Sequence, residues 1–152
     1  MAISNSSLIG ANFAGTGSTA LFALGTTANG TDGTNWQYVE ATSTFITGEL
    51  VLLNPASTAK TLLTALLTGS AEGVNIAVSQ GVISQREFGW VATKGRNLYV
   101  LCTGTVTAGG ETGGAFSANS GRLQNAAAAG VGQTCLGLFI TTSASTGTAS
   151  VA

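Results

Sequence analysis

The chain of 152 residues contains no histidine and only two cysteines. Histidine is the commonest general base and metal ligand in proteins, and it is the usual partner of a serine or cysteine nucleophile. Two cysteines without histidine cannot complete a structural zinc site. The six acidic residues are well separated along the chain, so the sequence does not indicate a catalytic carboxylate pair. We therefore predict a protein that is not an enzyme, with no catalytic residues, no cofactor and no metal.

Charge of either sign is also scarce. Five basic and six acidic residues make up 7% of the chain, whereas soluble domains average about 25%. Neutral hydroxyls and small apolar groups are easier to dehydrate than ions, and the cores of permanent subunit contacts are depleted in charge. A disordered chain is the weaker alternative, because disorder accompanies low hydrophobicity and high charge. We expect a homo-oligomer.

Further absences narrow the list of partners and compartments. The chain has no polybasic run, so we expect no nucleic-acid partner. It has no apolar run of roughly 20 residues, so we expect no membrane partner. A basic stretch followed by an apolar one is missing at the N-terminus, which predicts synthesis in a cytoplasm without secretion.

The two cysteines each lie inside an apolar run, Cys102 after Tyr99-Val100-Leu101 and Cys135 before Leu136-Gly137-Leu138-Phe139. This setting favours buried thiols that act as small hydrophobic side chains. A disulfide between them requires neighbouring strands with suitable Cβ directions, and the sequence leaves that pairing open.

Short apolar or aromatic runs, separated by turn residues, predict strands throughout the chain after Leu21. The predicted strands are Phe22–Leu24, Trp36–Ala41, Phe45–Ile46, Leu50–Leu53, Val74–Ser79, Val82–Ile83, Phe88–Thr93, Leu98–Cys102, Thr105–Thr107 and Leu136–Thr142. Such spacing is typical of an all-β, single-domain barrel or sandwich.

Two turns in this pattern are well marked. Asn29-Gly30 and Asp32-Gly33 favour the positive φ of a tight hairpin. Lys94–Asn97 is predicted to join Phe88–Thr93 to Leu98–Cys102 in a second hairpin. The strand Leu98–Cys102 is apolar on both faces, so we expect it to be central and covered on both sides.

One segment, Pro55 to Gly69, is a candidate helix. Proline near its start, glycine at its end and the leucines at helical spacing favour a short helix. Its many threonines weaken that interpretation, and the same leucines would also suit a buried strand.

Residues 1–20 are rich in serine, asparagine, glycine and alanine, and they predict an extended N-terminal arm before a β-rich domain over residues 21–152. The arm is either a frayed terminus or a segment that becomes ordered against a partner, and the sequence does not decide between them.

Four aromatic residues stand at strand spacing and are candidate anchors in the core or in a subunit interface: Trp36, Tyr38, Phe88 and Trp90. Together with Tyr99 they could also stack on sugars or bases, although strand spacing favours packing.

Several short motifs follow one another along the chain. The first group is the succession of Phe22-Ala-Leu-Gly-Thr26, Asp32-Gly33 and Trp36-Gln-Tyr-Val39 with Ala41. The later motifs are Gly73–Val78, Phe88–Val91 with Gly95, a Val/Thr strand ending at Gly109, Gly121–Leu123 and Gly137–Ile140. In this order the motifs resemble the small head decoration (cement) proteins of tailed phages, and the first group is the most specific part. The resemblance covers roughly Phe22 to Ala152.

This resemblance implies a β-barrel or β-tulip-like domain, commonly trimeric, that lies on the outer capsid surface of a virion. It implies that the major capsid protein is the partner, that the protein bridges capsomers, and that no catalytic residues carry over. Another virion subunit, such as a tail or fibre component, fits low charge and β content equally well. A histidine-free ligand-binding barrel is the third and weakest alternative.

Overall fold

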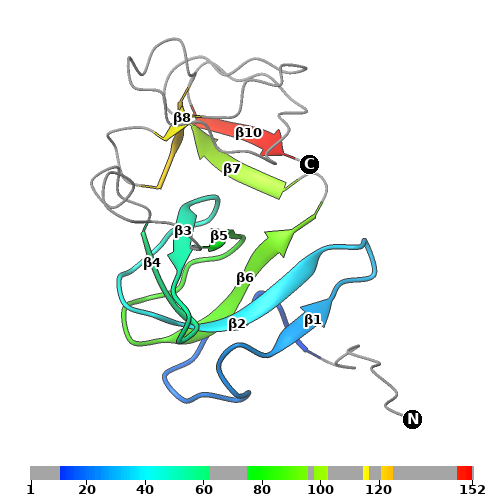
Figure 1. The fold of residues 1–152 in the computed structure, drawn as a ribbon, viewed down its shortest axis with the longest axis vertical. Coiled ribbons are helices and arrows are strands. Elements are labelled where there is room, and N and C mark those ends of the chain that lie inside the picture. Colours follow the sequence, from blue (N-terminus) through cyan, green and yellow to red (C-terminus); the bar gives the residue numbers. More distant parts are fainter. Residues whose placement is uncertain are drawn as a thin grey trace.

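The computed structural model describes residues 11–61, 75–95, 98–102, 115–116, 121–124 and 147–151 (Figure 1). Within these residues the chain forms strands and turns and no helix, so the predicted all-β class is confirmed. The first sheet contains β1 (Thr27–Asn29), β2 (Asn35–Ala41), β3 (Leu50–Leu53), β4 (Thr58–Thr61), β5 (Asn75–Ser79) and β6 (Phe88–Lys94). The second contains β7 (Leu98–Cys102), β8 (Ala115–Phe116), β9 (Leu123–Gln124) and β10 (Gly147–Val151).

The first sheet closes into a barrel of five strands. Its order is β1-β2-β4-β3-β5-β6, and β2 also pairs with β6, which joins the two ends of the run from β2 to β6. The pair β2–β4 is parallel and the others are antiparallel, and β1 is an additional strand beside β2. The structure therefore has the barrel and not the sandwich among the two predicted architectures.

The barrel core follows from the alternation of side chains along each strand. Val39 and Ala41 of β2 point inward, as does Val91 of β6, and all three are fully buried. Phe45 and Ile83 form an antiparallel bridge and fill the core with two of its largest side chains. The core cluster consists of Val39, Ala41, Phe45, Val51, Leu53, Ala59, Ala77, Ile83 and Val91.

Two matching turns follow the bridged pair of Phe45 and Ile83. In each turn a glutamate closes a backbone hydrogen bond to the residue three positions earlier, Glu49 to Ile46 and Glu87 to Ser84. Each glutamate also accepts a hydrogen bond from that residue's N–H through Oε2, at 2.9 and 3.0 Å. The third position has positive φ in both turns, +83° at Gly48 and 68° at Arg86. The chain thus repeats one turn structurally although its sequence shows no exact repeat.

The first predicted hairpin is present between β1 and β2. Its tip runs from Gly30 to Gly33, and Gly33 adopts a φ of +84°. Asp32 accepts hydrogen bonds from the backbone N–H and the hydroxyl of Thr34, which is 1% exposed. This side chain therefore fixes the tip of the hairpin.

The second predicted hairpin is wrong. Although Lys94 and Gly95 leave β6 as the sequence suggests, β6 already pairs with β2 on one edge and with β5 on the other. A strand in a closed barrel has no free edge, so β7 cannot return beside β6. It pairs instead with β10 and β9.

The strand β7 is central in the second sheet, as predicted, but it is not covered on both faces. Leu98, Val100 and Cys102 are buried, whereas Tyr99 is 43% exposed. Hydrogen bonds attach this region to the barrel. Leu101 N–H donates to the Gly48 carbonyl and Leu50 N–H to the Gly121 carbonyl, each at 2.8 Å, and the Gln80 side-chain amide donates to the Tyr99 carbonyl and accepts from the Tyr99 N–H. In Figure 1 the second sheet lies beyond the β3 and β5 side of the barrel.

Several other predictions differ from the structure. Phe22–Leu24 is not a strand, and the first strand in the described part of the chain begins at Thr27. Pro55 begins no helix, because Asn54 to Ser57 form the turn between β3 and β4, and β4 follows. Some predictions fall outside the described residues, namely the leucines at 62–67, the strands Thr105–Thr107 and Leu136–Thr142, and Cys135.

No helix in the described ranges is long and apolar enough to span a membrane.

Candidate functional site

The outer face of β2 and β6 carries the four aromatic residues that the sequence singled out. The register places Tyr38 opposite Trp90, and Trp36 and Phe88 lie two positions away on their respective strands. Since Val39 and Val91 point into the barrel, these four side chains point outward on one face. The structure therefore brings Trp36, Tyr38, Phe88 and Trp90 together.

Within this group the Tyr38 ring packs against the rings of Trp90 and Phe88. The ring centroids of Tyr38 and Trp90 are 5.1 Å apart with an interplanar angle of 59°, and those of Tyr38 and Phe88 are 6.4 Å apart. Tyr38 is 3% exposed and Trp90 is 2% exposed, while Trp36 and Phe88 are partly buried. Tyr38 and Trp90 are thus core residues of the chain itself, and a role for the four in a subunit interface stays a prediction.

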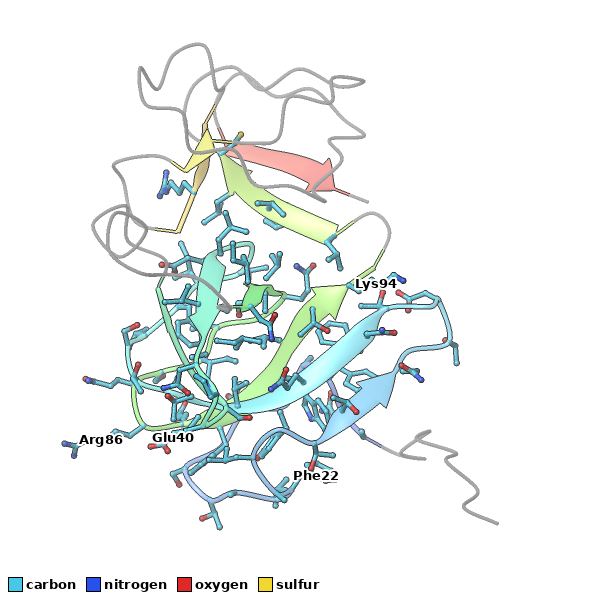
Figure 2. All side chains as sticks on the ribbon, viewed as in Figure 1. Phe22, Glu40, Arg86 and Lys94 are labelled. Atoms are coloured by element: carbon cyan, nitrogen blue, oxygen red, sulfur yellow. The ribbon has the colours of Figure 1, made fainter. Side chains whose placement is uncertain are left out.

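Residues 11–24, which we call the covering segment, lie across this aromatic face. Phe13 stacks on Trp36, with centroids 4.9 Å apart and planes 6° apart, and meets Trp90 edge-on at 5.4 Å. Phe22 meets both Tyr38 and Trp90 at 5.2 Å. Figure 2 shows Phe22 beneath the β1–β2 hairpin. Sequence reasoning missed Phe13, and the available signal was a lone aromatic residue among small polar ones.

Few backbone contacts hold the covering segment. Gly17 and Phe88 exchange two hydrogen bonds, at 3.1 and 2.8 Å, and Leu21 N–H donates to the Tyr38 hydroxyl oxygen at 3.1 Å. Residues 11–20 thus contact the barrel, while residues 1–10 lie outside the described part. The predicted division into an arm over 1–20 and a domain over 21–152 stays a prediction.

A cavity of about 220 Å³ lies between the covering segment and the aromatic face. Its lining residues are Asn12, Gly15, Thr16, Gly17, Thr19, Leu21, Phe22, Tyr38, Phe88 and Trp90. None of them carries a charged side chain at neutral pH. The Tyr38 hydroxyl accepts one hydrogen bond, and within the described residues it donates none.

The chain matches no family model, no curated protein and no solved structure among those compared with it. Its function must therefore be argued from its own residues.

Three of the described acidic residues serve local turns. Glu49 and Glu87 close the two matching turns, and Asp32 fixes the β1–β2 hairpin. The backbone N–H of Thr34, together with its hydroxyl, lowers the pKa of Asp32 below its usual 3.8. No three metal-ligating residues gather in the part of the chain that the structure describes. Cys102 is fully buried.

Three charged side chains lie at or beside the ends of the barrel strands β2 and β6. Figure 2 shows Glu40 and Arg86 at one end of β2 and β6, and Lys94 at the opposite end.

Two of the exposed large apolar residues are neighbours in the β-bridge region of the barrel. Ile46 and Val82, which follow the Phe45–Ile83 bridge as the next pair, are 46% and 56% exposed. Two adjacent apolar residues do not by themselves define an interface.

Proposed function

We propose that the chain is a virion structural protein that binds the outside of a tailed-phage head and stabilises it by bridging capsomers. The observation that carries this proposal is the connection among the motifs of the resemblance. Gly25 N–H donates to the Tyr38 carbonyl at 2.9 Å, and Tyr38 N–H donates to the Thr26 carbonyl at 2.8 Å. The Leu-Gly-Thr and Trp-x-Tyr-Val motifs, with Asp32-Gly33 between them, thus belong to one folded unit around the β1–β2 hairpin.

The physical chemistry of the chain supports this role. A surface with eleven charged residues along the whole chain is easily dehydrated, which suits extensive permanent contacts. Many copies that each add a modest interface stabilise a shell through multivalency. A protein that binds the assembled shell and not its free subunits stabilises the shell by mass action.

An inert role is also supported by the use of the acidic residues. The sequence has no histidine, and three of the described carboxylates hold turns. A general acid or base must be positioned to reach a reacting atom, and a carboxylate that caps its own turn is engaged elsewhere. We therefore propose a protein without catalytic activity.

Gold labelling of intact particles tests the location. An antibody against this chain, imaged by negative-stain electron microscopy, is expected to label the head. Label confined to the tail or its fibres would overturn the decoration role and favour the rival role of a tail or fibre component. An antibody against the major capsid protein marks the head in the same images and serves as the reference.

Light scattering tests the oligomeric state. The chain has a mass of 15.0 kDa, so a trimer has three times that mass, about 45 kDa. We expect this mass to persist on dilution to micromolar concentration. A monodisperse monomer at that concentration would count against permanent self-association.

A further inference from the structure

The cavity beneath the covering segment has an incomplete hydrogen-bond arrangement at its floor. Tyr38 is 97% buried, and its hydroxyl oxygen accepts a hydrogen bond from Leu21 N–H at 3.1 Å. A tyrosine hydroxyl can also donate one, and within the described residues this hydrogen has no acceptor. Buried polar groups nearly always form hydrogen bonds, so we expect the Tyr38 hydroxyl to donate to an acceptor inside the cavity.

The remaining lining limits the chemistry of that acceptor. Phe22, Phe88 and Trp90 supply apolar aromatic surface, while Asn12, Thr16 and Thr19 supply neutral amide and hydroxyl groups. No charged side chain among them could pair with a phosphate, a carboxylate or an ammonium group, and an unpaired charge is costly to bury. The occupant is therefore neutral, with an apolar face and several hydroxyl or ether oxygens.

The size of the cavity limits the occupant to a single ring. Pockets for drug-sized ligands measure about 300–1,000 Å³, and this cavity of about 220 Å³ is smaller. We propose that it binds one neutral pyranose ring, with the apolar C–H face of the sugar against the aromatic side chains and a ring hydroxyl or ether oxygen accepting from the Tyr38 hydroxyl. This site lies outside the barrel and is independent of the decoration role.

Titration of the full-length protein with neutral monosaccharides, followed by nuclear magnetic resonance, tests the site. A ligand with one ring is expected to bind with a Kd on the order of 1 mM. The two tryptophans provide an internal control, because Trp90 lines the cavity and Trp36 does not. We expect the indole N–H signal of Trp90 to shift more than that of Trp36. A matched acidic sugar, glucuronate against glucose, is expected to bind more weakly.

Two variants and one control locate the interaction. Tyr38→Phe removes only the hydroxyl, and we expect it to weaken binding about 10-fold, since one neutral hydrogen bond contributes about that much. Thr19→Tyr places a larger side chain at the exposed rim and is expected to block the cavity without disturbing the core. Tyr99→Phe removes the hydroxyl of an exposed tyrosine of β7 that does not line the cavity, and we expect binding to be unchanged.

Three results would overturn the proposal. The first is that no sugar shifts the Trp90 signal at sugar concentrations up to 50-fold above the expected Kd of about 1 mM. The second is that Tyr38→Phe and Thr19→Tyr bind sugar as tightly as the unaltered chain, and the third is that the largest shift occurs at Trp36. The neutral ring could be a free sugar or the terminal unit of a surface polysaccharide. Binding to an oligosaccharide at least 10-fold tighter than to its terminal monosaccharide identifies the polysaccharide, and equal binding identifies the free sugar.

Discussion

Substitution of Phe13 by alanine tests whether the covering segment stabilises the fold. Phe13 is partly buried and makes two ring contacts, with Trp36 at 4.9 Å and with Trp90 at 5.4 Å. Fully buried Phe→Ala changes cost about 3–5 kcal/mol, and each aromatic pair contributes about 0.5–1.5 kcal/mol. Because Phe13 is only partly buried, we expect a loss of about 2 kcal/mol in the free energy of unfolding.

Calorimetry and hydrogen exchange measure this loss in complementary ways. For a chain of this length, 2 kcal/mol corresponds to a fall in Tm of about 4–8 °C. Amide exchange in residues 14–24 is expected to accelerate more than exchange in the barrel strands, because the ring anchors the segment locally. Leu21→Ala is the matched control. Leu21 belongs to the same segment but is 79% exposed, so we expect a change within about 0.5 kcal/mol.

The reasoning would be refuted by a Phe13→Ala protein whose Tm and exchange rates equal those of Leu21→Ala. Such a result would mean that residues 11–24 do not rest on the aromatic face in solution. Accelerated exchange without a change in Tm would instead show that the segment opens as a unit of its own, and the predicted global loss would be wrong.

Three further changes test the turns and the core. Arg86→Gly is expected to raise the free energy of unfolding, measured by chemical denaturation, by up to about 1 kcal/mol, because Arg86 has a φ of 68°. Gly48→Ala, at the equivalent position of the other turn, should lower it. A change of the same sign in both variants would contradict the match between the two turns. Gly89→Ala is expected to cost about 1–3 kcal/mol, since its Cβ would lie 2.7 Å from Ile83 Cδ1, while Gly81→Ala meets no atom within 4 Å and should be nearly neutral. Asp32→Asn should lower stability at neutral pH, and the difference should shrink as the pH falls below the usual aspartate pKa of 3.8. The folded-state pKa of Asp32 is depressed, so its contribution is present above the unfolded-state pKa and lost as the pH falls through the folded-state value; a pH-independent difference between the two proteins would argue against this.

Local signals in the sequence predicted several of the strands and the first hairpin. The run Trp36–Ala41 became β2, Leu50–Leu53 became β3, and glycine at position 33 formed the predicted turn. The same alternation placed Trp36, Tyr38, Phe88 and Trp90 on one face once β2 and β6 paired. These features depend on side chains a few residues apart, which a sequence displays directly.

Pairing between distant strands was beyond the reach of local signals. The strand β6 ends at Lys94 as the sequence suggests, but the next described strand, β7, joins another sheet because β5 and β2 occupy both edges of β6. Likewise, residues 11–20 show little strand periodicity, and the position of Phe13 depends on an aromatic surface that forms only when β2 meets β6. The cavity, and the Tyr38 hydroxyl group that faces it, depend on the same pairing of β2 with β6.

The closure between β2 and β6 also has a consequence for synthesis. Its pairs join Glu40 to Phe88, 88 − 40 = 48 residues apart, and Asn35 to Lys94, 94 − 35 = 59 residues apart. At about 5–20 residues per second, a ribosome needs roughly 2–10 s to make the 48 residues between the first pair. During that interval β2 has an unpaired edge and exposed Trp36 and Tyr38, which favours aggregation. Slower translation should therefore lower the soluble yield of this chain, and lower concentrations of nascent protein should restore it.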